Sequence, residues 1–224
     1  MIDFLQAIDN DIMLALNQWH TPYWDKFMSA FSGKIIWAPM YATIIYILFR
    51  NLNWKSALCF SLAIILAIAA ADMTCARLIR PFAERLRPSN LENPISSMVH
   101  IVDGYRGGAY GFPSCHAANS FALASFIALL FRNRALGWFI FIWATLNSYT
   151  RLYLGVHYPG DLLVGAIIGS TIGIIVYKVS STLVERHKLT LEYNQAPNSG
   201  YHHTAILPIT GIAIILAILV FAAF

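Results

Sequence analysis

Three short polar clusters lie where long apolar segments of the sequence begin or end. They are Arg80…Arg87-Pro88, Pro113-Ser114-Cys115-His116 and Thr150-Arg151…His157…Asp161. Charged side chains are costly at the ends of membrane helices and usually have a function there. The planar guanidinium group of arginine matches phosphate oxygens bidentately, and two histidines can divide the roles of nucleophile and general acid. Together the clusters indicate phosphoryl-transfer chemistry on a membrane substrate.

The third cluster places a carboxylate where it can orient a histidine. His157 immediately precedes a helix that Pro159 can start, and Asp161 follows the histidine at the spacing of one helical turn. A hydrogen bond from one ring nitrogen to Asp161 would fix the tautomer and leave the other nitrogen free to attack phosphorus. The alternative interpretation is a helix-capping aspartate beside a bystander histidine.

The second cluster is typical of a helix N-terminus that can hold an anion. Ser114 suits the N-cap position, so the backbone N–H groups just beyond it lack partners within the helix. Such a terminus attracts phosphate, and His116 in the first turn could point at the same anion. The alternative is an ordinary capped membrane helix with an interfacial histidine.

Arginines supply the positive charge of the predicted site. Arg80, Arg87 and Arg151 would face the three non-bridging oxygens on which charge develops during phosphoryl transfer. Snorkelling towards the interface competes well for three other arginines, which are not assigned to the site: Arg77, Arg85 and Arg106.

The composition is that of a protein whose solvent is mostly lipid. Hydrophobic residues make up 58% of the 224 residues, charged residues make up 12%, and the mean hydropathy is +0.60. A soluble domain averages about 45–50% apolar and about 25% charged residues. The net charge of +4 comes without a lysine-rich run or a basic helix, so nucleic acid is not expected as a partner.

The apolar segments predict an all-α fold, a polytopic membrane bundle of about six transmembrane helices in a single domain, 1–224. Residues 1–33 predict an amphipathic, interfacial segment, because apolar residues alternate there with acids and amides before a run of aromatics. Polar connections are expected at 80–113 and 179–203, and the first is long enough to be an active-site loop. The six spans are expected at about 35–49, 56–79, 114–131, 135–154, 159–178 and 204–224.

Six spans would place both termini on one side of the membrane. The connections that carry the clusters, 80–113 and 151–158, would lie together on that side, as they must if the clusters form one site. Once the arginines of the clusters are set aside, lysine and arginine concentrate on the opposite side. The site is therefore predicted to face the periplasm or exterior, away from the cytoplasm, in a bacterial cytoplasmic (inner) membrane.

The clusters resemble the signature of the type 2 phosphatidic acid phosphatase family, membrane lipid phosphatases related to the vanadium haloperoxidases. That signature runs Lys-x6-Arg-Pro, then Pro-Ser-Gly-His, then Ser-Arg-x5-His-x3-Asp. The sequence matches its order and spacing as Arg80-x6-Arg87-Pro88, Pro113-Ser114-Cys115-His116 and Thr150-Arg151-x5-His157-x3-Asp161. The resemblance covers residues 55–180, which are the expected catalytic core.

The resemblance implies a mechanism that uses no metal and no cofactor. His157 would attack phosphorus to form a phosphohistidine, Asp161 would orient it, and His116 would protonate the departing lipid oxygen before water releases phosphate. The phosphoryl oxygens would be held by Arg80, Arg87, Arg151, Ser114 and the amide of Cys115.

The implied substrate is a phosphomonoester or diphosphate of an envelope lipid. Undecaprenyl diphosphate, a lipid A phosphate, phosphatidylglycerophosphate and phosphatidate all fit the motifs. The expected partners are this substrate and the surrounding membrane lipids, and no protein partner is indicated.

Cys115 is the departure from the signature that matters most. Glycine at this position lets the backbone approach phosphate, and a thiol could crowd that space. A helical first-turn conformation would tolerate the cysteine, so activity is expected. The alternative is a non-catalytic lipid-phosphate-binding membrane protein with an impaired site. A transporter is disfavoured, because the ionisable residues cluster at one interface and not at broken helices near mid-membrane.

Overall fold

The computed structural model describes residues 2–186 and 201–224, and within these ranges it contains helices and no β-strand. The all-α prediction is confirmed. The helices are α1 (Ile2–Asn17), α2 (Pro22–Phe31), α3 (Ala38–Asn51), α4 (Trp54–Met73), α5 (Arg80–Ala83), α6 (Cys115–Phe131), α7 (Arg134–Tyr153), α8 (Pro159–Arg186) and α9 (Ile206–Ala222). Shorter helical turns occupy Ile35–Trp37 and Ser96–Met98, and a π-helical stretch, Thr74–Ile79, joins α4 to α5.

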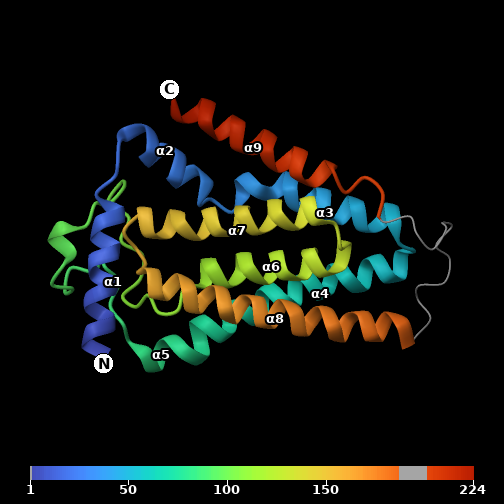
Figure 1. The fold of residues 1–224 in the computed structure, drawn as a ribbon, viewed down its shortest axis with the longest axis horizontal. Helices are drawn as coiled ribbons and strands as arrows, with labels where there is room; N and C mark the ends of the chain where they lie inside the picture. The colour runs from blue at the N-terminus through green and yellow to red at the C-terminus, as the bar shows by residue number, and fades with distance from the viewer. Residues whose placement is uncertain (1, 187–200) are drawn as a thin grey trace.

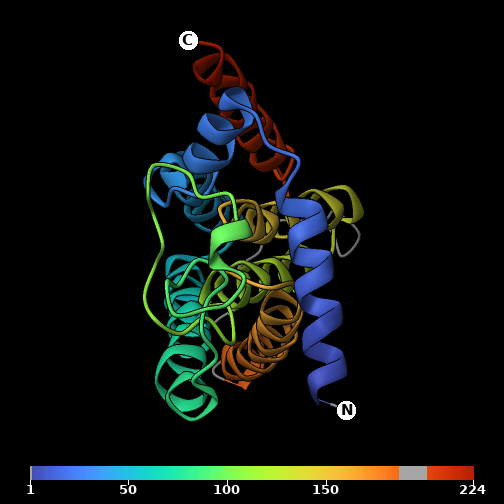
Figure 2. The same cartoon turned by 90° about the vertical axis from the view of Figure 1, so that its left-hand side faces the viewer.

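The long helices lie side by side, and α1 crosses the bundle at one end (Figure 1). α6 packs against α4, α7 and α8, while α9 packs against α2 and α3. Figure 2 looks onto the end that α1 crosses, where the connection between α5 and α6 also lies. The connections expected at 80–113 and 151–158 are therefore at the same end of the bundle, as the sequence predicted.

The contact between α6 and α8 is built from small residues. Three glycines of α8, spaced four apart, face three small residues of α6 with the same spacing. The pairs are Gly165 with Ser114, Gly169 with Ala118 and Gly173 with Ala122. A Cβ added at any of these glycines would collide with the backbone carbonyl of its partner. Such close approach stabilises helix pairs in lipid, where no hydrophobic effect drives them together. We call this contact the glycine seam.

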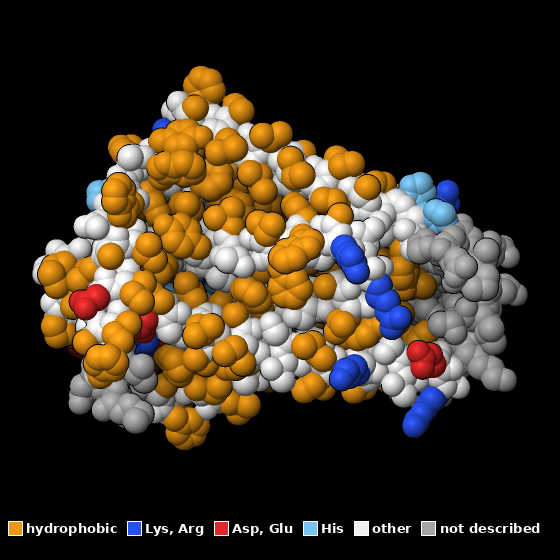
Figure 3. All heavy atoms as spheres, in the orientation of Figure 1, with side chains coloured by type: hydrophobic (Ala, Val, Ile, Leu, Met, Phe, Trp, Pro, Cys, Tyr) orange, Lys and Arg blue, Asp and Glu red, His pale blue; other side chains and the backbone are white. Residues whose placement is uncertain are grey.

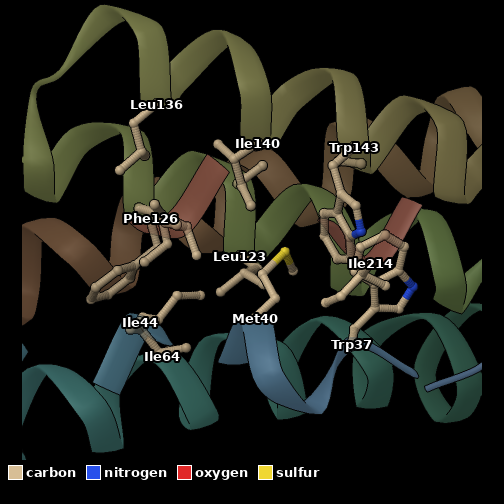
Figure 4. Close-up of a cluster of buried hydrophobic side chains, with 14 of the residues drawn as sticks. Trp37, Met40, Ile44, Ile64, Leu123, Phe126, Leu136, Ile140, Trp143 and Ile214 are labelled. Carbon is tan, nitrogen blue, oxygen red and sulfur yellow. The ribbon is translucent and has the colours of Figure 1, made fainter. Parts of the chain in front are cut away.

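The main hydrophobic core lies on the other side of α6. Side chains of α3, α6, α7 and α9 interdigitate there, and Figure 4 shows Met40, Leu123, Ile140 and Ile214 pointing towards one another. All four are at least nine-tenths buried. The core and the glycine seam together hold α6 at the centre of the bundle.

Capping residues explain where several helices begin. Asn133 accepts a hydrogen bond from the backbone N–H of Leu136 at 3.1 Å, which starts α7 directly after the left-handed Arg132 ends α6. Ser114 caps α6 in the same way through Ala117. Asparagine and serine are among the residues preferred at this position.

Two helical segments are long and apolar enough to cross a membrane alone, Trp54–Ala83 and Pro159–Arg186. α2 and the segment Ile35–Asn51, bent by 65° at their junction, form a third if they are counted as one broken span. Two shorter apolar helices, α6 and α9, have 17 residues each. These findings support a helical membrane bundle, and the count of about six spans stays a prediction.

Two expected boundaries differ in the structure. The segment 1–33 is divided between α1 and α2, and only α1 crosses the end of the bundle. Apolar side chains spaced four residues apart along α1 are exposed: Phe4, Ile8, Ile12 and Leu16. α8 continues past its expected end at 178 to Arg186, because Val179, Leu183 and Val184 extend the apolar pattern into the predicted polar connection. The remainder of that connection, 187–200, lies outside the described residues.

Hydrophobic side chains cover the flank of the bundle in Figure 3, and lysine and arginine gather at the end opposite to α1. Many large apolar side chains of the long helices are more than half exposed, among them Leu62 and Ile65 of α4 and Leu163 of α8. A soluble protein rarely exposes a continuous apolar surface of this kind. The flank therefore has the character expected of a surface solvated by lipid.

Replacing Gly169 by valine should disrupt the glycine seam. The new side chain would collide with the backbone of Ala118, and overpacking of this kind costs about 1–3 kcal/mol. We expect a clearly lower unfolding temperature in detergent. Gly137→Ala is the matched control, because a Cβ there meets only Ala128 Cβ at 3.9 Å. Equal unfolding temperatures for the two variants would contradict the importance of the seam.

Candidate active site

The structure brings the third cluster into one hydrogen-bonded unit. His157 Nδ1 lies 3.2 Å from Asp161 Oδ2, and the backbone N–H of Tyr158 donates to the same oxygen at 3.0 Å. Asp161 is completely buried and His157 is nearly so. Because the carboxylate accepts a hydrogen bond from Nδ1–H, the proton stays on Nδ1 and the lone pair of the ring is left on Nε2. This is the tautomer that the sequence predicted for a nucleophile.

Arg87 faces the free nitrogen of this histidine. Its Nη1 lies 2.8 Å from His157 Nε2 and donates to the carbonyl of Val156, also at 2.8 Å. A guanidinium has no acceptor, so Arg87 must be the donor to Nε2 as well. Attack of Nε2 on phosphorus therefore requires Arg87 to move this donor from the ring to a phosphoryl oxygen.

The surroundings of His157 keep its ring uncharged. Burial lowers the pKa of His157 to about 4, and the positive charges of Arg87 and Arg151 act in the same direction, whereas the hydrogen bond to Asp161 opposes them. Burial, followed by the charges of Arg80 and Arg151, lowers the pKa of Arg87 to about 10. At neutral pH the histidine is neutral and the arginine is charged, which suits a nucleophile beside an anion-binding cation.

The arginines assigned to phosphate each keep one buried donor without a partner. Arg80 Nη2 donates to Pro113 O at 2.9 Å, and Arg151 Nη1 donates to Ser32 Oγ at 2.7 Å. The Nε atoms of Arg80, Arg87 and Arg151 are nonetheless buried and have no hydrogen-bond partner within residues 2–186 and 201–224. A buried donor left unpaired costs about 1–3 kcal/mol, and more when it is charged. A ligand with several acceptor oxygens would satisfy all three.

The second cluster lies at the N-terminus of α6, beside the histidine unit. The N–H of Ser114 donates to the backbone carbonyl of Asp161 at 3.0 Å, which ties the start of α6 to the start of α8. His116 Nε2 lies 3.4 Å from the carbonyl of Ser32. The Sγ of Cys115 accepts from Arg80 Nη2 at 3.0 Å, a contact that glycine could not make. All eight residues predicted for the site thus lie at this end of the bundle.

Sequence reasoning left out two residues in direct contact with the site, Asp9 and Arg85, because Asp9 lies outside the clusters and snorkelling competed well for Arg85. Arg85 Nη1 donates to Asp161 Oδ1 at 2.9 Å, and its Nη2 forms an ion pair with Asp9 Oδ2 at 2.6 Å. The guanidinium also lies over the ring of Tyr158, at 4.0 Å from its centroid. Asp9 belongs to α1, and its Oδ1 accepts from the backbone N–H of Gly160 at 2.8 Å. α1 is thereby connected to the carboxylate that holds His157.

The connection between α5 and α6 packs closely against the same unit. A Cβ at Gly111 would lie 3.1 Å from Asp161 Oδ2 and 3.1 Å from Arg87 Cγ. Tyr105 of the same connection receives a hydrogen bond from Arg151 Nη2 at 3.3 Å. Because its residues touch the nucleophile unit and the arginines, this connection forms one wall of the site.

In the part of the chain that the structure describes, no group of three or more His, Cys, Asp or Glu side chains is placed so that it could hold a metal ion.

A family model described as the PAP2 superfamily matches residues 56–185, more than half of the chain. The chain belongs to the PAP2 superfamily. This confirms the resemblance to membrane lipid phosphatases that the three clusters indicated, and the match begins and ends close to the expected catalytic core. The roles of individual residues in this PAP2 protein stay predictions.

Known PAP2 proteins resemble the chain over most of its length. A lipid A 4'-phosphatase of Bacteroides thetaiotaomicron is 51% identical over 227 residues, covering 99% of this chain and 98% of the relative. The crystal structure of Aquifex aeolicus LpxE superimposes with a TM-score of 0.57 at 25% identity, covering 75% of this chain and 93% of that one. A transmembrane PAP2 type phosphatidylglycerolphosphate phosphatase of Bacillus subtilis gives a TM-score of 0.55 at 21% identity, covering 81% and 87%, and shows the fold alone. The PAP2 protein itself has helices that are long and apolar enough to cross a membrane and many exposed apolar side chains, as expected of a membrane protein.

The low pKa of His157 predicts a ring that stays neutral in mild acid. An ordinary histidine, with a pKa of about 6.5, is mostly protonated at about pH 5.5. A pKa lowered to about 4 delays protonation of His157 until the pH falls below that value. Nitrogen NMR of the histidine-labelled protein should show this, with His157→Gln identifying the signal. A His157 signal that titrates near its ordinary pKa would contradict the analysis.

Asp9→Asn should lower turnover although Asp9 lies outside the three clusters. The amide keeps the shape of the side chain but removes the charge that holds Arg85 against Asp161. We expect kcat to fall by about threefold to tenfold, equivalent to about 1 kcal/mol, with KM nearly unchanged. Asp11→Asn is the control, because Asp11 is exposed on the same helix. Equal activity of both variants would show that the ion pair does not position the carboxylate.

Proposed function

We propose that this chain is an envelope lipid phosphatase that removes a phosphate from lipid A through a phosphohistidine intermediate and without a metal ion. The observation that carries this proposal is the set of buried, unpartnered Nε donors on Arg80, Arg87 and Arg151 around the neutral His157. Phosphoryl transfer depends mainly on positioning and on stabilising charge at the non-bridging oxygens. Convergent arginines and an uncharged nucleophile are the groups that such a reaction needs.

The first chemical step forms a bond between His157 Nε2 and phosphorus and breaks the bond between phosphorus and the lipid oxygen. The bound phosphate dianion favours the protonated form of His116, which then gives its proton to that oxygen, so the lipid leaves as an alcohol. Asp161 stabilises the positive charge on the phosphorylated ring through Nδ1. Water then attacks phosphorus, returns a proton to His116 and releases phosphate with regeneration of His157. Ser114 and the Cys115 amide would hold phosphoryl oxygens at the α6 N-terminus.

Lipid A phosphate is the proposed substrate because the relative from Bacteroides thetaiotaomicron is a lipid A 4'-phosphatase and matches nearly the whole chain at 51% identity. Undecaprenyl diphosphate, phosphatidylglycerophosphate and phosphatidate are the substrates against which this proposal is to be compared. No part of the phosphate site itself distinguishes among them, since each presents the same phosphoryl oxygens.

We place the protein in the bacterial cytoplasmic (inner) membrane with its site facing the periplasm. The end of the bundle opposite the site carries basic residues of the α3–α4 and α6–α7 connections and of α8 (Figure 3): Arg50, Lys55, Arg132, Arg134, Lys178 and Arg186. Lysine and arginine favour the cytoplasmic side of short membrane loops. The contacts of α1 with the catalytic end support a single domain that includes residues 1–33 and the last helix together with the core.

A lipid-phosphate-binding protein without turnover is the second candidate. It is favoured by Cys115, whose Sγ occupies a donor of Arg80 that glycine would leave available for phosphate. Substitution Cys115→Gly distinguishes the two candidates. A wild-type protein that is inactive but becomes active as Cys115→Gly would be a binder with an impaired site.

Phosphate release from lipid A phosphate by the purified protein tests the proposal directly. We expect release to persist in EDTA and to fall at least about a thousandfold in His157→Ala, because the substitution removes the nucleophile. His203→Ala is the control, since His203 is exposed and lies outside the site. Wild-type turnover in His157→Ala would refute the nucleophile, and loss of turnover in EDTA would refute the metal-free mechanism.

A further inference from the structure

A cavity of about 230 Å³ adjoins the candidate active site on the bundle-interior side of His116. It is bounded by the turn at Ser32–Lys34, by α3 and α4, and by the inner faces of α6 and α7. Trp37, Leu123 and Trp143, which point towards one another in Figure 4, form part of its apolar lining. This volume suits part of a ligand and not a whole lipid.

The cavity and the phosphate site share residues at their boundary. Ser32 and His116 both line the cavity. Ser32 Oγ accepts from Arg151 Nη1 at 2.7 Å, and its carbonyl lies 3.4 Å from His116 Nε2. His116 is the residue that would protonate the departing oxygen. A substrate whose phosphate lies among the arginines would therefore direct its leaving group into the cavity.

The buried polar atoms without partners divide between these two places. Six such side-chain atoms exist in the described ranges, and three are the Nε atoms of the phosphate-binding arginines. The other three belong to residues that line the cavity: Asn119 Oδ1, Trp143 Nε1 and Asn147 Oδ1. Buried polar groups are nearly always hydrogen-bonded in native proteins, so a concentration of exceptions calls for a ligand. Trp143 is 2% exposed and Asn147 8% exposed.

These groups offer both kinds of hydrogen bond. The indole N–H of Trp143 can only donate. Asn119 Nδ2 donates to Asp72 Oδ1 at 3.0 Å, which fixes the orientation of this amide and leaves its carbonyl oxygen as an acceptor. Asn147 Nδ2 donates to Ser120 Oγ at 2.7 Å, and Asn147 Oδ1 has no partner among the described residues. A matching ligand must therefore carry at least one donor and one acceptor.

The positions of Asn119 and Asn147 along their helices place these groups close to the predicted phosphate site. Asn119 lies four residues beyond Cys115 in α6, and Asn147 lies four residues before Arg151 in α7. Four residues correspond to about 6 Å along a helix. The ligand groups must thus lie within a few bonds of the phosphate-bearing carbon and not at the far end of an acyl chain.

We propose that this cavity binds the polar part of the departing alcohol and selects glycolipids that carry hydroxyl or amide groups next to the phosphate. This inference rests on the proposed phosphatase function and adds the recognition of the leaving group to it. An N-acylated, hydroxylated sugar lipid supplies donors and acceptors at this depth. A polyprenyl chain supplies neither, and an ester-linked glycerolipid supplies acceptors alone.

Trp143→Phe and Asn147→Leu test the proposal with three phosphorylated lipids. These are a glucosamine lipid phosphate with amide-linked 3-hydroxyacyl chains, a short-chain phosphatidate and a polyprenyl phosphate. For the sugar lipid, we expect each variant to lower kcat/KM by about tenfold, the effect of one lost hydrogen bond to a buried partner. The polyprenyl phosphate should change by less than about twofold. Trp138→Phe, the same substitution at an exposed position of α7, is the control.

The outcomes separate this inference from the proposed function. Suppose that the wild type is active and that the variants lower turnover of all three lipids equally, or of none. This result would overturn the proposed role of the cavity and leave the proposed phosphatase function intact. The dephosphorylated sugar lipid tests the cavity without catalysis. It should raise the unfolding temperature of the wild type and of Trp138→Phe but not of Trp143→Phe. An equal rise in Trp143→Phe would also overturn the proposal, even if no lipid is hydrolysed.

Discussion

The glycine seam between α6 and α8 is the contact on which the geometry of the site depends. Because Gly165, Gly169 and Gly173 have no side chain, the backbones of the two helices approach until Cβ atoms would collide. Of these three glycines, Gly165 lies nearest to the site, beside the carbonyl of Ser114. It places the N-terminus of α6 next to the N-terminus of α8, so the anion-binding end of one helix faces the His157 unit carried by the other. A wider separation would split the site in two.

The charged side chains around His157 are the second feature that determines the properties of the site. Positive charge outweighs negative charge around His157: the near neighbours are Arg80, Arg85, Arg87 and Arg151 on one side and Asp9 and Asp161 on the other. Such an excess is unfavourable within a membrane protein unless an anion balances it. Burial is the main cause of the lowered pKa of His157, and the charges of Arg87 and Arg151 add to it. The gathered arginines therefore help to keep the ring uncharged, and a bound phosphate dianion would relieve the cost of gathering them.

The three clusters of the candidate site could be found from the sequence because each is short and has fixed internal spacing. His157 and Asp161 are one turn apart, so local geometry alone brings them together. The glycines of α8 are also spaced by four, a pattern visible in the sequence although its partner helix is not. Asp9 and Ser32 could not be found in this way, because their contacts with Arg85 and Arg151 join residues far apart in the chain. The 65° bend between α2 and the segment Ile35–Asn51 was also not predicted, and both parts contact α9, which is far away in the chain.

The ion pair between Asp9 and Arg85 bears on how this protein could have diverged from its relatives. The family match begins at residue 56, yet Asp161, which contacts His157, is held through Arg85 by a helix that precedes the match. Positions 9 and 85 are thus expected to vary together across lineages, with loss of the acid at one accompanied by loss of the guanidinium at the other. A chimaera that joins α1 of one relative to the core of another would inherit a mismatched pair. The residues that build this candidate site consequently extend beyond the segment by which the family is recognised.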